Sequence, residues 1–325
     1  MNESKPLGLY IHIPFCRQKC GYCDFYSLSG SEERMDAYCK ALLAHLTETA
    51  PQAAKHSVDT VYFGGGTPSL LGEKRLREIL KCIDKRYHVT KDAEITLEAN
   101  PDSAGDWRAL RALRKAGFNR ISLGMQSADD AELREIGRVH SMDQVRQAVD
   151  AARKARFDNL SLDLIYGLPH QTLELWRRNL EAAVALTPQH LSCYGLKVEE
   201  GTPLAQRVEE GEVLPDDDAQ ADRYLWTVGR LARAGFAHIS TPEAMELVKT
   251  AKNNGQDVYL ETCTHYLFLD ETYLEKFGAI AKCNPPLRPR ETVESLWKYA
   301  NDGSIDFIGS DHGGFTLAEK AKGKE

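Results

Sequence analysis

Short apolar runs alternate with amphipathic helical segments along most of the chain. Runs rich in β-branched and aromatic residues, typical of buried strands, are 8–14, 60–66, 94–100, 120–126, 159–167 and 190–196. Between them, apolar residues recur at helical spacing in 34–46, 73–87, 106–118, 142–157 and 172–186. This alternation predicts an α/β fold in which helices cover a parallel sheet.

Polar residues or glycines stand at the ends of nearly every predicted strand. They are 64–67, Glu98, Asn100 and Gln126, with Asp163 inside its strand. Because barrels build their sites at the carboxyl-terminal rim from several strands at once, this pattern favours a partial TIM-like barrel over an open sheet.

The strand–helix pattern continues to the end of the chain. Further strands are predicted at 237–240, 257–267 and 305–311, and further helices at 241–255 and 291–303. The strand candidates then number nine, one more than a closed eight-stranded barrel holds, so we expect 237–240 outside the barrel or an irregular junction. The acidic segment 209–220 is predicted to be an exposed loop before a helix.

Composition narrows the class of protein. The 325 residues are 42% hydrophobic and 27% charged, as in soluble globular proteins. The net charge of −7 argues against a nucleic-acid-binding face. The sequence contains neither a run long enough to span a membrane nor a secretory signal, so we expect a cytoplasmic protein.

Three of the eight cysteines are clustered, in the stretch FCRQKCGYC. Cys16, Cys20 and Cys23 suit an iron–sulfur cluster that leaves one iron without a protein ligand. The alternative is a partial zinc site completed by a remote histidine. The remaining cysteines are interpreted as small buried hydrophobic residues; they are Cys39, Cys82, Cys193, Cys263 and Cys283.

Six motifs, in one order, carry a family resemblance over about residues 7–237. They are GLYIHIPFCRQKCGYCDFYS, VYFGGGTPSLL, LEANPD, ISLGMQS, GRVHS and LDLIYGLPHQT. Together they resemble the oxygen-independent coproporphyrinogen III oxidase family of radical S-adenosylmethionine (SAM) proteins. The resemblance implies a 4Fe–4S cluster whose open iron chelates the methionine end of SAM and reduces it to a 5′-deoxyadenosyl radical.

The resemblance also implies a role for individual residues. Cys16, Cys20 and Cys23 would be the cluster ligands. The implied SAM contacts are Tyr10, Tyr22, Gly65, Gly66, Thr67, Glu98, Gln126, Arg138 and Asp163, with Lys197 on the same rim. Each has a simpler interpretation: the glycines as a tight strand exit, the acids as rim ion pairs, and Arg138 as a solvated helix charge.

Two features favour the heme-chaperone branch of this family over the decarboxylating oxidases. The first predicted strand begins at about Gly8, whereas the oxidases have a long preceding segment. Cys23 is followed by Asp24 and Phe25, where the oxidases have another cysteine. This branch implies heme as a further ligand and a heme-acceptor protein as partner; coproporphyrinogen III oxidation is the alternative.

The chain changes character near residue 238, which divides it into predicted domains 1–237 and 238–325. The second part resembles the last third of the cyclic amidohydrolases, the allantoinase, hydantoinase and dihydroorotase group, so the chain resembles a chimera. His238 and Asp311 match two metal ligands of that group, and His265 lies near its site. Two ligands do not hold a catalytic metal pair, so amidohydrolase activity is not expected. An inactive barrel chimera is a third reading.

Overall fold

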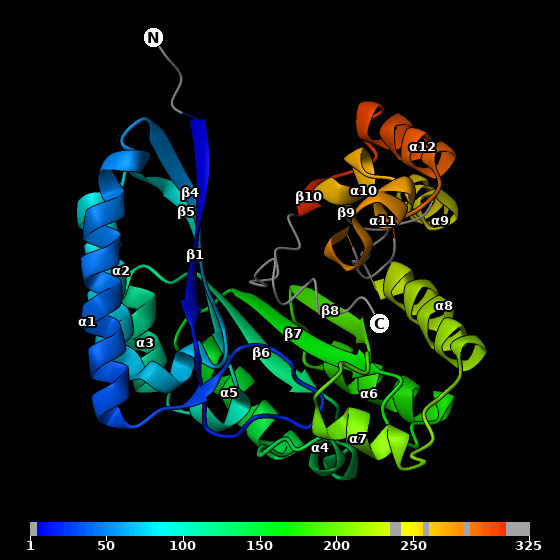
Figure 1. Ribbon diagram of the computed structural model, residues 1–325, viewed down its shortest axis with the longest axis horizontal. Coiled ribbons are helices and arrows are strands. Elements are labelled where there is room, and N and C mark those ends of the chain that lie inside the picture. The colour runs from blue at the N-terminus through cyan, green and yellow to red at the C-terminus, as the bar shows by residue number, and fades with distance from the viewer. Residues whose placement is uncertain (1–4, 235–241, 256–259, 282–286, 310–325) are drawn as a thin grey trace. The chain divides into compact units, whose positions relative to one another are not determined.

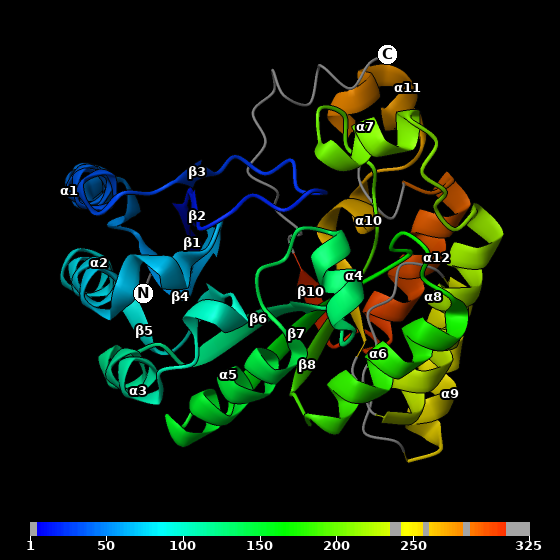
Figure 2. The same cartoon turned by 90° about the horizontal axis from the view of Figure 1, so that it is seen from below.

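The computed structural model of the chain describes residues 5–234, 242–255, 260–281 and 287–309. They form two compact units, one within residues 1–223 and the other within 224–325. The first unit contains a curled six-stranded parallel sheet (Figures 1 and 2). In spatial order its strands are β1 (Lys5–Ile13), β4 (His56–Gly65), β5 (Val89–Ala99), β6 (Arg120–Gln126), β7 (Asn159–Tyr166) and β8 (His190–Gly195).

Helices follow the strands along the chain and cover one face of this sheet (Figure 2). They are α1 (Glu32–Thr49), α2 (Gly72–Arg86), α3 (Trp107–Ala116), α5 (Met142–Lys154) and α6 (Leu173–Ala185). The short helices α4 (Asp130–Glu135) and α7 (Pro203–Glu209) follow β6 and β8, and α8 (Asp217–Ala234) spans the boundary between the two units. Three 3-10 turns complete the unit: η1 (Ala50–Ala53), η2 (Pro68–Leu71) and η3 (Pro101–Ser103). The predicted partial barrel is thus confirmed, with six strands and with helices at all five predicted positions.

The two faces of the sheet differ in polarity because side chains alternate along each strand. The face under the helices is apolar and buried; it includes Ile11, Val61, Phe63, Ile95, Leu97, Ile121, Leu123, Leu160 and Leu162. The opposite face is largely polar. Register pairs Glu98 with Ser122 and Ser122 with Ser161, while Asp163 lies opposite Gly124 and Ser192. The alternation therefore gives the sheet an apolar face under the helices and a polar face on the opposite side.

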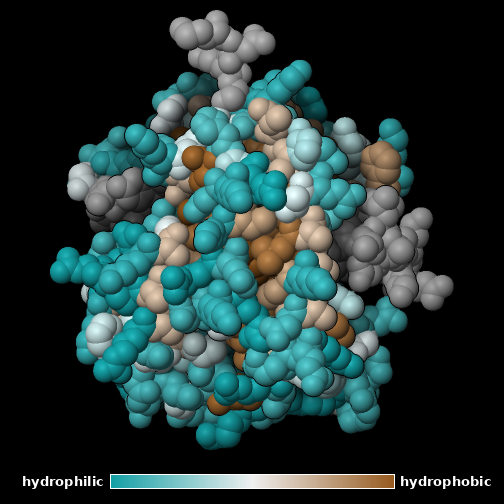
Figure 3. Space-filling model, turned by 90° about the vertical axis from the view of Figure 1, so that its left-hand side faces the viewer, coloured by the Kyte–Doolittle hydropathy of each residue, from teal (hydrophilic) through white to brown (hydrophobic). Residues whose placement is uncertain are grey.

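Helix α1 illustrates how the outer layer meets water. Met35, Cys39 and Leu46 are buried on one side, whereas its charged residues are exposed. Figure 3 shows this side of the molecule, where hydrophilic residues cover most of the surface.

The cysteine-containing loop begins where β1 ends. Two short strands, β2 (Phe15–Cys16) and β3 (Leu28–Ser29), pair with each other and close the loop. The backbone N–H of Gly66 donates to the Ile13 carbonyl at 2.8 Å, and that of Thr67 donates to Phe15 at 2.7 Å. These bonds fix the loop to the turn after β4.

The acidic segment 209–220 is a loop only in part. Helix α7 ends at Glu209 and α8 begins at Asp217, so 210–216 form the predicted loop. Asp217 and Asp218 lie in the first turn of α8, where carboxylates interact favourably with the helix dipole.

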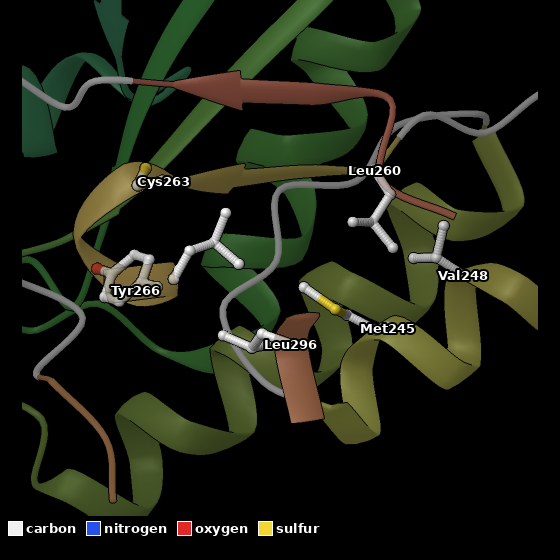
Figure 4. Packing of buried hydrophobic residues seen from close by; sticks show 7 residues of the cluster. Met245, Val248, Leu260, Cys263, Tyr266 and Leu296 are labelled. Carbon is white, nitrogen blue, oxygen red and sulfur yellow. The ribbon is translucent and has the colours of Figure 1, made fainter. Parts of the chain in front are cut away.

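The second unit has its own small core (Figure 4). Its elements are α9 (Pro242–Asn253), β9 (Glu261–Cys263), α10 (Thr264–Phe268), α11 (Thr272–Phe277), η4 (Gly278–Ala281), α12 (Arg290–Asn301) and β10 (Phe307–Gly309). Strands β9 and β10 pair in parallel as a two-stranded sheet. The core residues are Met245, Val248, Leu260, Cys263, Tyr266, Leu267 and Leu296.

The predicted strand 257–267 is wrong in its second half, because α10 begins directly after Cys263. Cys263, Tyr266 and Leu267 are buried, and their spacing of three and four residues is that of a helix face. The predicted strand 237–240 lies outside the described residues.

Gly66 allows the close approach between the cysteine loop and the β4 turn. A Cβ at this position would lie 2.6 Å from the Phe15 carbonyl oxygen and 2.9 Å from its nitrogen. Because these are backbone atoms, they cannot rotate away. We expect Gly66→Ala to destabilise the first unit by about 1–3 kcal/mol, measured by urea unfolding followed by circular dichroism.

The matched control is Gly105→Ala. A Cβ there would meet nothing within 4 Å, so the urea midpoint should stay close to that of the parent. Equal midpoints for both variants would contradict this account of the loop attachment.

Candidate functional site

The loop that carries the three clustered cysteines crosses the carboxyl-terminal edge of the sheet (Figure 1). All three thiols are free and half-buried. The loop is held in its middle by Gly21, whose N–H donates to the Ile136 carbonyl at 3.0 Å. The Gly21 carbonyl in turn accepts from the N–H of Leu204 at 2.8 Å. The loop is therefore anchored from β4, α4 and α7.

The thiols influence one another electrostatically. Burial raises the pKa of Cys23 to about 11, and the neighbouring Cys20 and Cys16 contribute in the same direction. Within the described ranges, no three histidine, cysteine, aspartate or glutamate side chains are arranged as a ready-made metal site. The donor set nevertheless fits an iron–sulfur cluster, since three cysteine sulfurs from one loop are its typical protein ligands.

Two of the sulfurs accept hydrogen bonds from neighbouring elements. The Thr67 hydroxyl donates to Cys16 Sγ at 3.6 Å, and Arg138 Nη1 donates to Cys20 Sγ at 3.5 Å. Asn100 joins the two donors: its Nδ2 donates to Thr67 Oγ1 at 3.1 Å, and its Oδ1 accepts from Arg138 Nη2 at 2.7 Å. Donors of this kind orient and stabilise sulfurs that bind a metal.

Glu98 lies at the end of β5, on the polar face. Its Oε1 accepts a 2.6 Å bond from the Tyr62 hydroxyl, and its Oε2 accepts a 3.1 Å bond from the Gly65 N–H. Gly65 has a φ of +112°, and a Cβ there would lie 2.6 Å from the His12 ring. Glycine is thus required to bring this backbone against the carboxylate.

The polar face holds two acidic groups whose pKa values are raised. Burial raises the pKa of Glu98 to about 7; Asp163 adds to the effect, while the Tyr62 hydroxyl opposes it. Burial also raises the pKa of Asp163, against the bonds from Ser192 and Ser122. The polar face of the sheet therefore holds two buried carboxyl groups that keep their protons more readily than exposed ones do.

Gln126 and Arg138 meet at Gly124 on β6. Arg138 Nη2 donates to the Gly124 carbonyl at 2.8 Å, and a Cβ on Gly124 would lie 2.9 Å from Gln126 Nε2. Gln126 has a φ of +63°, a left-handed conformation that is uncommon outside glycine. Such conformations concentrate at functional sites.

The two tyrosines predicted to flank the site lie in different surroundings. Tyr10 stacks on Tyr62 with ring centroids 6.1 Å apart, on the same face as Glu98. Tyr22 packs against the buried apolar cluster that includes Ile136 and Leu204. Tyr10 therefore lies on the polar face of the sheet, whereas Tyr22 packs beneath the cysteine loop.

Lys197 follows β8 and forms an ion pair with Glu199. Both charges affect Asp24 on the cysteine loop: burial and Glu199 raise the pKa of Asp24, and Lys197 lowers it. The structure thus places Lys197 beside the loop rather than among the buried carboxylates.

Sequence reasoning did not assign two of the residues that organise this site. In the sequence Asn100 stands out only as a polar strand end, because its two hydrogen-bond partners, Thr67 and Arg138, are distant along the chain. Tyr62 stands within an apolar strand, and only the structure shows its register beside Tyr10.

Of the three amidohydrolase-like residues, only His265 lies within the described part of the chain. His265 is half-buried in α10, with its ring centroid 4.1 Å from that of Tyr266. His238 and Asp311 lie outside the described residues.

The fold and site define a partial parallel barrel that carries three cysteines on the loop after its first strand. A family model described as the radical SAM superfamily matches residues 10–183. The chain therefore belongs to the radical SAM superfamily, whose members use a 4Fe–4S cluster and SAM.

Within this superfamily, the chain is similar to several individual proteins. Heme chaperone HemW of Mycobacterium tuberculosis is 42% identical over 238 residues, covering 72% of this chain and 60% of that protein. HemW of Escherichia coli is 40% identical over 243 residues, covering 74% and 63%. The structure of the E. coli coproporphyrinogen III oxidase, a radical SAM enzyme, matches with a TM-score of 0.66 at 30% identity, covering 71% of this chain and 54% of that one.

The chain spans about 60% of the length of the curated relatives that it matches. Among the helices that the structure describes, none is long and apolar enough to cross a membrane.

The raised pKa of Glu98 predicts a pH-dependent stability. Between about 4.5 and 7 the folded protein keeps a proton that the unfolded chain releases, so stability falls as pH rises through this range. Glu98→Gln removes that proton. Relative to the parent, we expect the variant to gain about 2 kcal/mol between pH 5 and pH 8 in urea unfolding.

Glu94→Gln is the control: Glu94 lies on the same face of the strand but is exposed, so this variant should keep the pH dependence of the parent. If Glu98→Gln retained that dependence too, Glu98 would not be the group that titrates.

Proposed function

We propose that this chain holds a 4Fe–4S cluster on Cys16, Cys20 and Cys23, binds SAM along the polar face of its sheet, and acts as a heme chaperone. Heme would be bound for transfer to an acceptor protein. The proposal requires a reducing compartment such as the cytoplasm, where free thiols persist.

One observation carries the proposal: the anchored cysteine loop lies at the edge where the polar strand ends meet. Thr67 and Arg138 donate to two of its sulfurs. A buried structural cysteine needs no such donors, whereas a thiolate that binds iron is stabilised by them.

The proposed SAM contacts follow the polar face. The N–H groups of Gly65, Gly66 and Thr67 already donate within the protein, so this turn offers carbonyl oxygens, which suit the amine of a methionine group. Glu98 can accept from an amine or from ribose hydroxyls. Gln126, Arg138 and Asp163 are assigned as further contacts, and Lys197 as a rim residue. When bound, the cluster supplies an electron to SAM.

The residues after Cys23 support the chaperone over the oxidase. Asp24 and Phe25 stand where the oxidases have a further cysteine. The sequence likeness to HemW points the same way, although it spans only part of those proteins.

We further propose that 1–237 form the cofactor-binding part and that 238–325 are an exchanged segment of amidohydrolase origin. Its support is the sequence resemblance together with the strand–helix order of α9, β9, α12 and β10. With only two ligand positions, His238 and Asp311, this segment is assigned no catalytic metal.

Anaerobic reconstitution with iron and sulfide tests the cluster. The parent should gain visible absorbance and about four irons per chain, with no stoichiometric zinc. Cys20→Ser should lose most of that absorbance, because serine oxygen is a poor ligand for the cluster. Cys82→Ser, which alters a cysteine outside the loop, is the control. Equal absorbance in the parent and Cys20→Ser would refute the assignment.

Heme binding tests the chaperone reading. Anaerobic titration with heme should give a saturable Soret band, while incubation with coproporphyrinogen III, SAM and a reductant should give no decarboxylated product. Product formation would favour the oxidase, and the lack of both responses would reject both functions.

A further inference from the structure

A continuous chain of side-chain hydrogen bonds joins two of the clustered thiols. From Cys16 Sγ it runs through the Thr67 hydroxyl to Asn100 Nδ2, a contact of 3.1 Å. From Asn100 Oδ1 it continues through Arg138 to Cys20 Sγ, with contacts of 2.7 and 3.5 Å. Asn100 stands at its centre and follows β5 directly.

Both polar atoms of the Asn100 side chain form hydrogen bonds, the nitrogen as a donor and the oxygen as an acceptor. The Nδ2 donates to Thr67, so it occupies an acceptor site of that hydroxyl and leaves its single proton for Cys16. The Oδ1 accepts from Nη2 of Arg138, whose Nη1 is then aimed at Cys20. Among neutral side chains, an amide supplies this donor–acceptor pair within one rigid plane.

The backbone at Asn100 is also held in place. Its carbonyl accepts from the N–H and the hydroxyl of Ser103 in η3, at 3.0 Å each. Arg138 has a second fixed partner, the Gly124 carbonyl at 2.8 Å. The chain of bonds therefore rests on three separate strand ends.

We propose that Asn100 is a positioning residue that sets the reduction potential of the cluster by aiming Thr67 and Arg138 at Cys16 and Cys20. The inference rests on the proposed cluster assignment. Hydrogen bonds and positive charge near the sulfurs stabilise the electron-rich reduced state. Removal of the Asn100 amide should consequently make the cluster harder to reduce.

The decisive variant is Asn100→Ala, measured by a redox titration of the reconstituted cluster that is followed by electron paramagnetic resonance. We expect the ratio of reduced to oxidised cluster at fixed potential to fall by about tenfold. For a one-electron couple this is a shift of about 59 mV toward more negative values.

A double-variant comparison separates positioning from general loosening. Thr67→Val removes the hydroxyl that donates to Cys16. If Asn100 acts through Thr67 and Arg138, the shift in Asn100→Ala plus Thr67→Val should be smaller than the sum of the single shifts. Additive shifts would overturn the proposed route.

Ser69→Ala is the matched control, because it removes a neighbouring hydroxyl that bonds from η2 to Ser103 in η3 at 2.7 Å and not to Thr67, Asn100 or Arg138. It should leave the midpoint unchanged. If Asn100→Ala does not fold, Asn100→Ser decides: its neutral hydroxyl adds no charge and is too short to bond both Thr67 and Arg138, so the midpoint should again lie below that of the parent.

The outcomes separate a failure of the proposed cluster from a failure of the proposed role of Asn100. A parent that assembles no cluster overturns the proposed function and this inference with it. A cluster in every chain, with the same midpoint in the parent and the Asn100 variants, overturns only the role of Asn100.

Discussion

The parallel register of the six-stranded sheet is the constraint on which the rest of the first unit depends. Because side chains alternate, one register places Leu97 and Leu123 beneath the helices and Glu98 and Ser122 on the other face. A shift of one residue would reverse both sets and bury charge against the helices. The same burial that stabilises the outer layer therefore creates the polar interior where the candidate site lies.

Holding carboxyl groups in that interior has a cost that the structure offsets locally. Glu98 receives the Tyr62 hydroxyl and the Gly65 N–H, and Asp163 receives two serine hydroxyls. The pKa values of both acids stay raised, so these bonds do not cancel the effect of burial. Acids with shifted pKa values concentrate at functional sites, where a ligand that carries a positive group can stabilise the carboxylate.

Much of the first unit could be predicted from the sequence, because periodicity reports strands and helices directly. Strand ends such as Glu98 and Asp163 followed from the same pattern. The partners of Asn100 could not be predicted, since Thr67 and Arg138 meet it only after three strands align. The helix α10 was mistaken for a strand because a short apolar run fits either structure. The environment of Tyr22 was also hidden, as it depends on packing against Ile136 and Leu204.

The central claim is that the cysteine loop holds a cluster with one iron open to SAM. Electron paramagnetic resonance of the reconstituted, reduced protein with and without SAM tests it most directly. The account predicts a cluster signal whose shape changes when SAM is added, because SAM binds the iron that lacks a protein ligand. A signal that is indifferent to SAM, or no cluster signal, would contradict it.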